Sequence, residues 1–402
     1  MLSFDDAQRL LAAYAEPVAG RETVPLAAAP GRVLAEAVTA VLDLPPSDNS
    51  AMDGYALRRA DWRAGEGLAL AGRCFAGEAP PPLPPGAAIR LFTGSQLPAG
   101  ADAVAMQEDA DERDGRVYIG REPRPGQHVR RRGEDVAAGQ ALLPAGSLLG
   151  PAHIALLAAQ GMAGVPVSRR LRAGILTNGD ELTPVGAPLG PRQIYNSNAA
   201  MLAALLAGIG VEVADCRHAP DDEAALRRDF AELGARCDLV FSVGGASVGE
   251  RDLVKPALAA LGAELDMWRV KMKPGKPVAL ARLGETPVLC LPGNPVSAFV
   301  VFALLATPLI RRMQGRAETM PPPARAALQS GAARRDIGRE DFLRVRLERD
   351  GAGGAVLVPF ASQGAAMISS LPWASGLARL PAGLEVADGD LVDYYDFARW
   401  LA

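Results

Sequence analysis

The sequence predicts a multidomain α/β protein, in which a domain with a mostly parallel sheet lies between smaller β-rich parts. From residue 169 to about residue 316, strand-like and helix-like segments alternate, which is typical of a parallel sheet with helices on both faces. The 43 glycines and 33 prolines gather in a few places instead of forming a repeat, and such clusters are typical of loops and domain joints. These clusters lie at residues 44–46, 80–86, 184–191 and 321–323.

The amino-terminal part is predicted to be an extended segment interrupted by a small β-rich domain. Ser3 and Asp6 resemble a capping box, which predicts a helix to about Tyr14. Short apolar runs separated by glycine or proline indicate a small β domain over residues 45–143. A helix with proline in its first turn is expected over 151–160. The extended segment then comprises residues 1–44 and 144–168.

The α/β domain is expected over residues 169–316, and its strand ends carry the polar residues. Helix caps are predicted at Ser197 or Asn198, and at Asp221. In a parallel sheet, ligands bind beyond the carboxyl ends of the strands. Three polar turns follow predicted strands in this domain, at residues 178–181, 244–252 and 292–295. The functional site is therefore expected at this edge of the sheet.

Residues 317–402 are predicted to form a small β-barrel or sandwich. Residues 342–349 alternate strictly between apolar and polar side chains, as in a half-buried strand. Leu343, Val345 and Leu347 are expected on one face, with Arg344 on the polar face. Asp350 and the glycine after it predict a hairpin turn into the next strand.

Composition excludes several classes of protein. The net charge of −4 gives no electrostatic reason to expect a nucleic-acid partner. The longest apolar stretch, residues 299–310, is too short for a membrane span and contains Pro308. Acidic residues stand where a signal peptide has basic ones, and the four cysteines are scattered without metal-ligand spacing. These features predict a cytoplasmic protein.

The glycine-rich turn at residues 242–255 is the first candidate binding element. Gly244, Gly245, Ser247 and Gly249 follow a buried apolar run and precede a predicted helix. A strand, a glycine turn and a helix in this order leave backbone N–H groups available to an anion. Asp252, at the start of that helix, is either a helix cap or a ligand to a metal that bridges phosphates.

A second candidate is the basic stretch that ends in the sequence KPGKP at residues 273–277. If the chain is extended here, Arg269, Lys271 and Lys273 share one face. Two prolines and a glycine fix Lys273 and Lys276, as binding of a multiply charged oxyanion requires. The alternative interpretation is a solvated basic turn.

Carboxylates form the opposite constellation, because three strand ends each carry at least one of them: Asp180, Glu181, Asp221, Asp222 and Asp252. Magnesium takes few carboxylates and completes its coordination with water and phosphate oxygens. The alternative for the aspartates is a cap or turn role, and a polar loop is the alternative for the stretch around Asp53. No P-loop is present in the sequence, whereas residues 245–249, GASVG, have the spacing of a G-x-S-x-G motif. The anion turn, the lysines and the carboxylates together favour metal-assisted phosphoryl or nucleotidyl chemistry.

Seven motifs, in order, resemble the molybdopterin molybdenumtransferases, the MoeA family that includes the E domain of gephyrin. They are DNSAMDGYA at 48–56, FTGSQLPAGADAV at 92–104, GDEL at 179–182, SVGGASVGERD at 242–252, KPGKP at 273–277, LPGNPVSAF at 291–299 and GREDFLRVRL at 338–347. This resemblance implies a homodimer of four-part subunits, with a three-layer α/β domain similar to molybdopterin adenylyltransferases and a C-terminal β-barrel. It also implies Mg²⁺-dependent insertion of molybdate into adenylylated molybdopterin, with release of AMP.

The resemblance also assigns residues to the site. Glu181, Asp221 and Asp252 would serve magnesium and substrate, while Asp53 and Thr93 would act from the small domain. The anion and pocket residues would be Arg269, Lys273, Lys276, Pro292, Pro295, Ser297 and Arg344, together with the glycine turn. Three residues depart from the family pattern: Asn178 replaces a usual Thr, Ala246 a Val, and Ala365 a Ser found in many members.

Two other functions fit the same scaffold. A molybdopterin adenylyltransferase acts one step earlier and needs only the α/β domain, so the flanking β-rich parts count against it. A non-catalytic organiser or regulator would keep the fold without turnover, but the acidic and basic site residues are intact. Contacts with the adenylyltransferase and with cofactor-accepting proteins are expected for the transferase, and no contact with nucleic acid or membrane.

Overall fold

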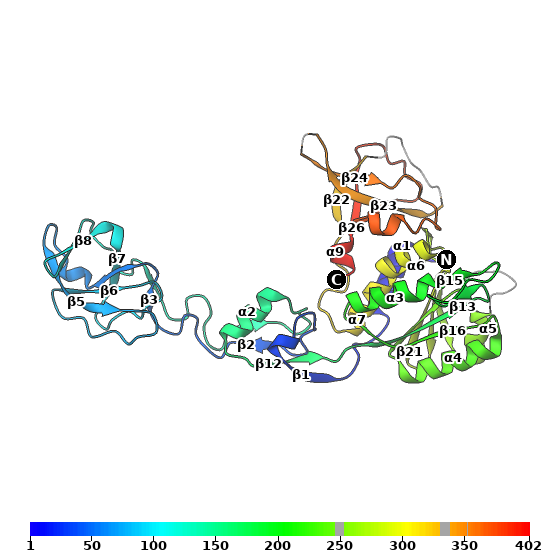
Figure 1. The fold of residues 1–402 in the computed structure, drawn as a ribbon, viewed down its shortest axis with the longest axis horizontal. Helices are drawn as coiled ribbons and strands as arrows, with labels where there is room; N and C mark the ends of the chain where they lie inside the picture. Colours follow the sequence, from blue (N-terminus) through cyan, green and yellow to red (C-terminus); the bar gives the residue numbers. More distant parts are fainter. Residues whose placement is uncertain (246–252, 330–337, 352) are drawn as a thin grey trace. The chain divides into compact units, whose positions relative to one another are not determined.

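The computed structural model describes residues 1–245, 253–329, 338–351 and 353–402, apart from the side chain of Trp268. The chain forms two compact units, each described here by itself (Figure 1). The first unit comprises residues 1–35, 145–150 and 164–402, and the second comprises residues 36–144 and 151–163. The segment predicted to be extended contributes residues to both units.

The second unit is built on a six-stranded sheet with the order β7-β4-β6-β5-β9-β8. Apolar side chains pack on both faces of this sheet, so that its strands form two small cores. The strands are β4 (Gly54–Leu57), β5 (Gly67–Cys74), β6 (Ala87–Leu91), β7 (Ala103–Met106), β8 (Ala110–Arg113) and β9 (Arg116–Ile119). Two short pairs and one helix complete the unit: β2 (Val38–Thr39) with β11 (Ala141–Leu143), β3 (Asn49–Ser50) with β10 (Val129–Arg130), and α2 (Pro151–Ala159).

The first unit begins with α1 (Phe4–Ala13), and the predicted cap is confirmed. The Ser3 hydroxyl accepts a hydrogen bond from the Asp6 N–H at 3.1 Å and donates to the Asp6 carboxylate at 2.6 Å. Phe4, Ala7 and Leu11 lie on the buried face of this helix. The chain then forms β1 (Arg21–Pro25), which pairs antiparallel with β12 (Gly164–Ser168).

The α/β domain contains a six-stranded mixed sheet with the order β16-β13-β17-β21-β20-β18. Its first four strands are parallel, as predicted, whereas β20 runs antiparallel to both of its neighbours, β21 and the edge strand β18. A hairpin joins β20 to β21, and strands joined by so short a connection are antiparallel, because parallel neighbours need a long crossover connection. The strands are β13 (Arg172–Asn178), β16 (Glu212–Ala219), β17 (Leu239–Val243), β18 (Glu264–Trp268), β20 (Ala279–Leu283) and β21 (Thr286–Leu291).

Helices cover both faces of this sheet and make three layers (Figure 1). Ile175 and Phe241 belong to the core that contains α1, α3 (Ser197–Gly208) and the helical run 295–313. Leu176 and Val240, the adjacent residues on the same strands, belong to the core under α4 (Glu223–Arg236) and α5 (Val254–Ala260). This alternation between two cores follows from the two-residue period of a strand.

One continuous helical run extends from Pro295 to Met313. It consists of α6 (Pro295–Val301), a π-helical turn η4 (Phe302–Ala306) and α7 (Thr307–Met313). By length and composition it could cross a membrane, but 89% of its most apolar window is buried inside the protein, as in a core helix. A π-turn leaves backbone groups without their usual partners, and the Gln8 amide donates to the Leu304 carbonyl at 2.9 Å.

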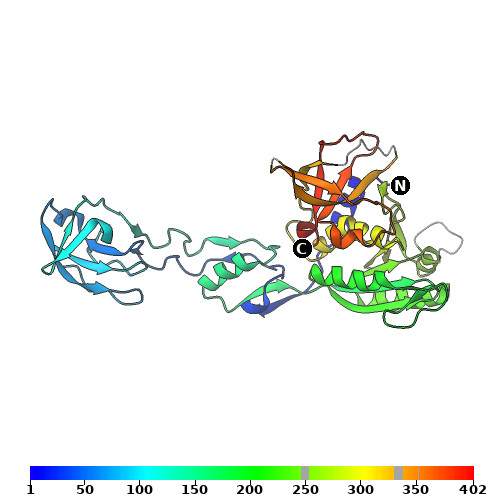
Figure 2. The ribbon, with the colours of Figure 1, turned by 45° about the horizontal axis from the view of Figure 1, so that its top comes forward.

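Five strands of the carboxyl-terminal region close into a barrel, coloured orange to red in Figure 2. Their order is β23-β24-β22-β26-β25, and β25 pairs back onto β23. They are β22 (Ala324–Leu328), β23 (Glu340–Arg349), β24 (Ala355–Pro359), β25 (Gly376–Leu380) and β26 (Leu391–Asp396), with short helices α8 (Ser370–Trp373) and α9 (Phe397–Trp400). The predicted hairpin from β23 into β24 is confirmed.

The strict two-faced pattern predicted for residues 342–349 is wrong. Arg344 is fully buried, and Leu347 is 43% exposed. The guanidinium of Arg344 is covered because it donates to the carbonyls of Ser362 and Gly364. The four residues of β23 from Arg346 onward are all exposed, so this end of the strand buries neither face.

Arg379 of β25 connects α1 to the barrel. Its guanidinium donates to both carboxylate oxygens of Asp5, at 2.8 and 2.9 Å, and to Glu340 at 2.8 Å. It also lies 5.0 Å from the centre of the Phe4 ring, which packs on Phe342 with centroids 4.6 Å apart. The amino-terminal helix and the barrel therefore share one core.

Replacing Arg379 by Met is expected to lower the free energy of unfolding by about 2 kcal/mol, because Glu340 would lose its ion-pair partner in a mostly buried setting. Urea titration of the full chain measures this loss. Arg9→Met, on α1, is the matched control, since the Arg9–Asp6 pair is exposed and its loss should cost less than about 0.5 kcal/mol. Equal losses in the two variants would contradict the assigned contact.

Asp238 anchors the amino end of β17. It accepts two hydrogen bonds from the Arg169 guanidinium, at 2.8 and 2.7 Å, and one from the Arg172 N–H at 2.8 Å. Burial acts to raise the pKa of Asp238, but these partners outweigh burial and hold the pKa below its usual value. The resulting stability is present above the unfolded pKa of about 3.9 and is lost as the pH falls through the folded value.

Asp238→Asn is therefore expected to be about 1–2 kcal/mol less stable than the wild type at pH 7. The difference should shrink as the pH falls below about 4, where the wild-type carboxylate also loses its charge. Unfolding in urea at a series of pH values gives both curves. Glu16→Gln, at a carboxylate whose side chain is 85% exposed, is the control and should differ little from wild type.

Candidate functional site

Three polar turns meet at the carboxyl edge of the sheet, because the strands that precede them are adjacent and parallel. Thr177 of β13 is in register with Val243 of β17, which is in register with Leu291 of β21. The turns that follow these residues are therefore neighbours. A Cβ atom added to Gly293 would lie 3.9 Å from the Gly244 Cα, so the second and third turns are in contact.

Gly244 and Gly245 begin the glycine turn with positive φ angles of 103° and 58°. A Cβ atom on Gly244 would lie 2.7 Å from the Asn178 carbonyl oxygen and 2.8 Å from its side-chain oxygen. Glycine is thus required here both by backbone conformation and by the close approach of β13. Ser247, Gly249 and Asp252, the other predicted residues of this turn, lie outside the described residues, as does Ala246.

The carboxylates after β13 and β16 lie together. The Asn178 amide donates to the Asp221 carboxylate at 3.0 Å, and the Asp221 N–H donates to the Asp180 carboxylate at 3.1 Å. Glu181 turns its carboxylate back over Gly179, where an added Cβ would meet Oε2 at 2.6 Å. Within the described ranges, no group of three acidic, histidine or cysteine side chains has the geometry of a metal site.

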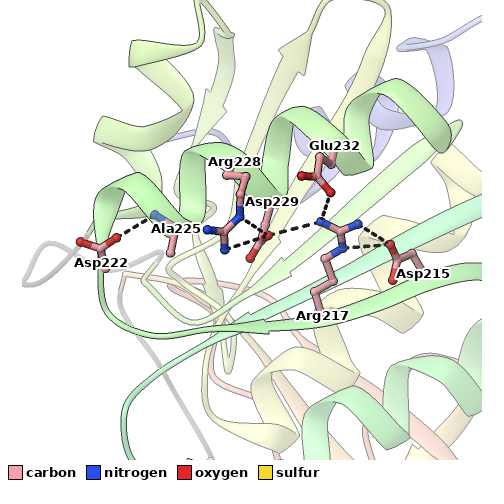
Figure 3. Close-up of polar contacts among 7 residues, drawn as sticks. All are labelled: Asp215, Arg217, Asp222, Ala225, Arg228, Asp229 and Glu232. Carbon is pink, nitrogen blue, oxygen red and sulfur yellow. Dashed lines mark hydrogen bonds and ion pairs between the residues drawn. The ribbon is translucent and has the colours of Figure 1, made fainter.

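The predicted cap of α4, Asp221, is wrong, because Asp222 occupies that position (Figure 3). The Asp222 carboxylate accepts from the Ala225 N–H at 2.8 Å. The backbone places the cap one residue later than the sequence pattern suggested, and boundaries of this kind shift easily. The side chain of Asp221 therefore does not cap the helix, and it instead accepts the hydrogen bond from Asn178. Likewise, Asn196 caps α3 in place of Ser197 or Asn198.

Arg217 fixes α4 against β16 and so supports the turn that carries Asp221 (Figure 3). Its guanidinium donates to Glu232 at 2.7 Å and to Asp215 at 2.9 Å, and lies 3.3 Å from Asp229. Hydrogen bonds to Glu232 and Asp215 raise the pKa of Arg217 above its usual value. The charge cluster thus joins the strand and the helix on either side of the turn.

The basic stretch is not uniformly extended. Arg269 has a positive φ of 65°, which breaks the expected alternation with Lys271 and Lys273. Lys273 lies in β19 (Met272–Lys273), which pairs with β23, and its ammonium group donates to Asp341 at 3.1 Å. Lys276 is exposed. The barrel therefore contributes Asp341 to this basic segment.

The third turn supports α6. The Asn198 amide donates to the Gly293 carbonyl at 2.7 Å, which joins α3 to this turn. Pro292 and Ser297 are buried, and Pro295 is half-buried at the first position of the helix. Buried side-chain oxygens of Asn178 and Asn198 accept no hydrogen bond within the part of the chain that the structure describes.

Arg344 faces inward and organises the segment around Ala365. Its guanidinium donates to the carbonyls of Ser362 and Gly364, at 3.2 and 3.0 Å, and to the Ser370 hydroxyl at 3.1 Å. Burial lowers the pKa of Arg344. One terminal nitrogen, Nη1, is buried and has no partner among the described residues. Arg344 thus holds the backbone on either side of Gln363 and keeps one donor unused.

Asp53 and Thr93 form a hydrogen-bonded pair in the second unit. The Thr93 N–H and hydroxyl donate to the same oxygen of Asp53, at 2.7 and 2.8 Å. The backbone donor and then the hydroxyl lower the pKa of Asp53. The carboxylate is exposed and ionised at neutral pH, so it is suited to bind a cation or to accept hydrogen bonds.

Asn178, Asn198 and Asp341 were not among the predicted site residues. Asn178 and Asn198 are neutral amides, and nothing in their local pattern separates a site residue from a turn or cap residue. Asp341 contacts Lys273 across 68 positions of sequence, which no local pattern reports. Their roles depend on tertiary contacts.

Gly244→Ala is expected to lower the free energy of unfolding by about 2 kcal/mol or more, through backbone strain and the clash with Asn178. Gly262→Ala is the control, because Gly262 also has a positive φ, of 75°, but an added Cβ there meets nothing within 4 Å. That variant should lose only about 1 kcal/mol. Chemical denaturation of both proteins tests the difference, and similar losses would show that no close approach limits position 244.

Comparisons with known proteins agree with this architecture. The chain matches the MoeA N-terminal region (domain I and II) over residues 2–161, a probable molybdopterin binding domain over 174–312, and the MoeA C-terminal region (domain IV) over 328–397. The MoeA protein of Pyrococcus horikoshii, a solved structure, superimposes with a TM-score of 0.84 at 29% identity, covering 98% of this chain and 99% of that one.

Curated relatives are similar over most of their length. The molybdopterin molybdenumtransferase of Haemophilus influenzae is 39% identical over 346 residues, which are 86% of this chain and 85% of that protein. The Synechococcus elongatus protein of the same name is 37% identical over 397 residues, covering 95% and 96% of the two chains. With three MoeA regions matched in order and relatives covered almost completely, the chain belongs to the MoeA family of molybdopterin molybdenumtransferases.

Proposed function

We propose that this protein inserts molybdenum into molybdopterin in the biosynthesis of the molybdenum cofactor. The observation that carries the proposal is its 39% identity to a curated molybdopterin molybdenumtransferase over 85% of that protein. The convergence of three polar strand-end turns gives the α/β domain a binding edge that suits a phosphorylated substrate. In the full proposal, adenylylated molybdopterin and molybdate react in the presence of Mg²⁺, AMP is released, and molybdenum binds the dithiolene.

The acidic turns suit magnesium. Asp180, Glu181 and Asp221 offer carboxylate oxygens from adjacent turns, and Mg²⁺ prefers one or two such ligands together with waters and phosphate oxygens. We assign Glu181 and Asp221 to the ion, with Asp252 as the third predicted ligand. When bound, Mg²⁺ neutralises charge on the phosphate oxygens as a Lewis acid. The protein residues hold the phosphoanhydride where water can attack it.

The cations would bind the oxyanions. Lys273 is fixed by Asp341 and keeps a side chain that is 44% exposed, so its ammonium group can bind a phosphate or molybdate oxygen as well. Lys276 and Arg269 extend this charge along the same loop. Gly244, Gly245, Ser247 and Gly249 would bind phosphate through backbone N–H groups, and Pro292, Pro295 and Ser297 would shape the pocket.

Arg344 acts differently from the other cations in this proposal. Because three of its hydrogen bonds hold the segment 362–370, its first role would be to position that backbone near the oxyanion. Its remaining buried donor, Nη1, could bind the oxyanion directly. Asp53 and Thr93 would serve the reaction from the small β-rich domain.

We further propose that the enzyme is a cytoplasmic homodimer, as the family resemblance implies. Its expected partners are the adenylyltransferase that supplies the substrate and the proteins that accept the finished cofactor. Neither nucleic acid nor membrane is expected as a partner.

The test is an assay with purified protein, adenylylated molybdopterin, Mg²⁺ and molybdate, in which AMP and molybdenum cofactor are followed. AMP release that requires molybdate is the expected result. Asp221→Ala should reduce the rate by about 100-fold, the size usual for loss of a group that binds the reacting phosphates. Glu223→Ala, two residues along in the first turn of α4, is the control and should retain activity.

Two other outcomes would contradict the proposal. Adenylylation of free molybdopterin from ATP would identify an adenylyltransferase, although that step needs only the α/β domain. A folded protein that binds molybdopterin without turnover would be an organiser or regulator. Analytical ultracentrifugation of the same preparation tests the homodimer separately.

A further inference from the structure

We propose that Asn178 is a positioning residue, which fixes the carboxylate of Asp221 through its side-chain amide. This inference rests on the proposed function, because it assigns to Asn178 the orientation of a magnesium and substrate group. The geometry that supports it lies entirely within the described residues.

Asn178 is the last residue of β13 and is only 7% exposed. Its Nδ2 donates to Asp221 Oδ1 at 3.0 Å. The orientation of the amide is fixed chemically, since an ionised carboxylate only accepts hydrogen bonds and must face the NH₂ end. The same aspartate donates its backbone N–H to Asp180 at 3.1 Å. Asp221 is thus held at its backbone by one turn residue and at its side chain by another.

The amide itself cannot move freely, because the glycine turn packs against it. A Cβ atom on Gly244 would lie 2.8 Å from Asn178 Oδ1, and one on Gly245 would lie 3.4 Å from Nδ2. Both glycines therefore allow the backbone of the turn to approach the amide. A donor held in this way loses little freedom when it forms its hydrogen bond, which is how supporting residues orient a ligand.

The other end of the amide indicates that the site is built for a ligand. Asn178 Oδ1 is buried and accepts no hydrogen bond from the residues that the structure describes. Buried acceptors are rarely left unpaired, and exceptions occur at functional sites. We infer that this oxygen faces the space between the first two turns, while Nδ2 donates its hydrogen bond to Oδ1 of Asp221. The second carboxylate oxygen of Asp221 would then be left to bind the cation or its water.

The Asn178→Thr and Asn178→Val variants separate hydrogen bonding from packing. Threonine and valine have nearly the same shape, but only threonine can donate to Asp221. Asn178→Val is expected to raise the half-saturating Mg²⁺ concentration for AMP release by about tenfold, the lower limit for loss of a group that supports a metal ligand. Asn178→Thr should stay within about threefold of the wild type. At saturating Mg²⁺, the kcat values of both should be close.

A direct binding measurement accompanies the assay. Mn²⁺, used as the probe in place of Mg²⁺, is titrated into the full-length proteins with AMP present, and free Mn²⁺ is followed by electron paramagnetic resonance. The valine variant should bind Mn²⁺ about tenfold more weakly than the threonine variant. Gln314→Ala is the control for lost stability, because Gln314 is also 7% exposed and its amide also donates a buried hydrogen bond, to Ile209. It should bind Mn²⁺ as the wild type does.

Equal Mn²⁺ affinities for the threonine and valine variants would overturn the proposal, as would the absence of Mn²⁺ binding by the wild type. A valine variant that loses kcat at saturating Mg²⁺ with an unchanged half-saturating concentration would also overturn it. Failure of the proposed function is a different result: wild-type protein would then bind Mn²⁺, and the two variants would differ, without any molybdate-dependent release of AMP.

Discussion

The parallel pairing of β13, β17 and β21 is the constraint on which the candidate site depends. It brings three turns that lie far apart in the sequence to one edge, and Gly244 then contacts both Asn178 and Gly293. Nothing larger than glycine fits at position 244. The glycine turn packs against the amide of Asn178, which in turn binds Asp221, so the position of this carboxylate depends on backbone packing as well as on charge.

The barrel takes part in the same arrangement through two polar connections. Asp341 binds Lys273 beside the short β19–β23 pairing, and Arg379 binds Asp5 on α1. The first connection orients a cation of the basic loop, and the second joins the amino-terminal helix to a core shared with the barrel. The carboxyl-terminal region therefore contacts both the basic stretch and the amino-terminal helix.

The sequence was sufficient to predict the fold class, the parallel core and a β-rich carboxyl-terminal region, because each depends on local periodicity and on turn residues. Periodicity left a barrel or a sandwich open there, and the family resemblance indicated the barrel. The cap at Ser3 was also predicted, because it is a local motif: Ser3 and Asp6 lie three positions apart and bind each other. Caps at Asp221 and Ser197 were misplaced by one residue, since several polar residues compete there. Arg344 was misplaced for another reason: the segment 362–370 covers it, and the pattern of its own strand contains no information about that cover. The amide of Asn178 depends on tertiary contacts too.

The hydrogen bond from Gln8 to Leu304 has a consequence for biosynthesis. The two residues are 296 positions apart, and the bond satisfies a carbonyl in the π-turn of the central helix. At usual rates of synthesis, Gln8 precedes its partner by on the order of 15–60 s. During that time the core around the apolar face of α1 lacks most of the helical run 295–313. Helix α1 thus leaves the ribosome well before the helical run that it packs against, and it can reach its final place only after that run has been made.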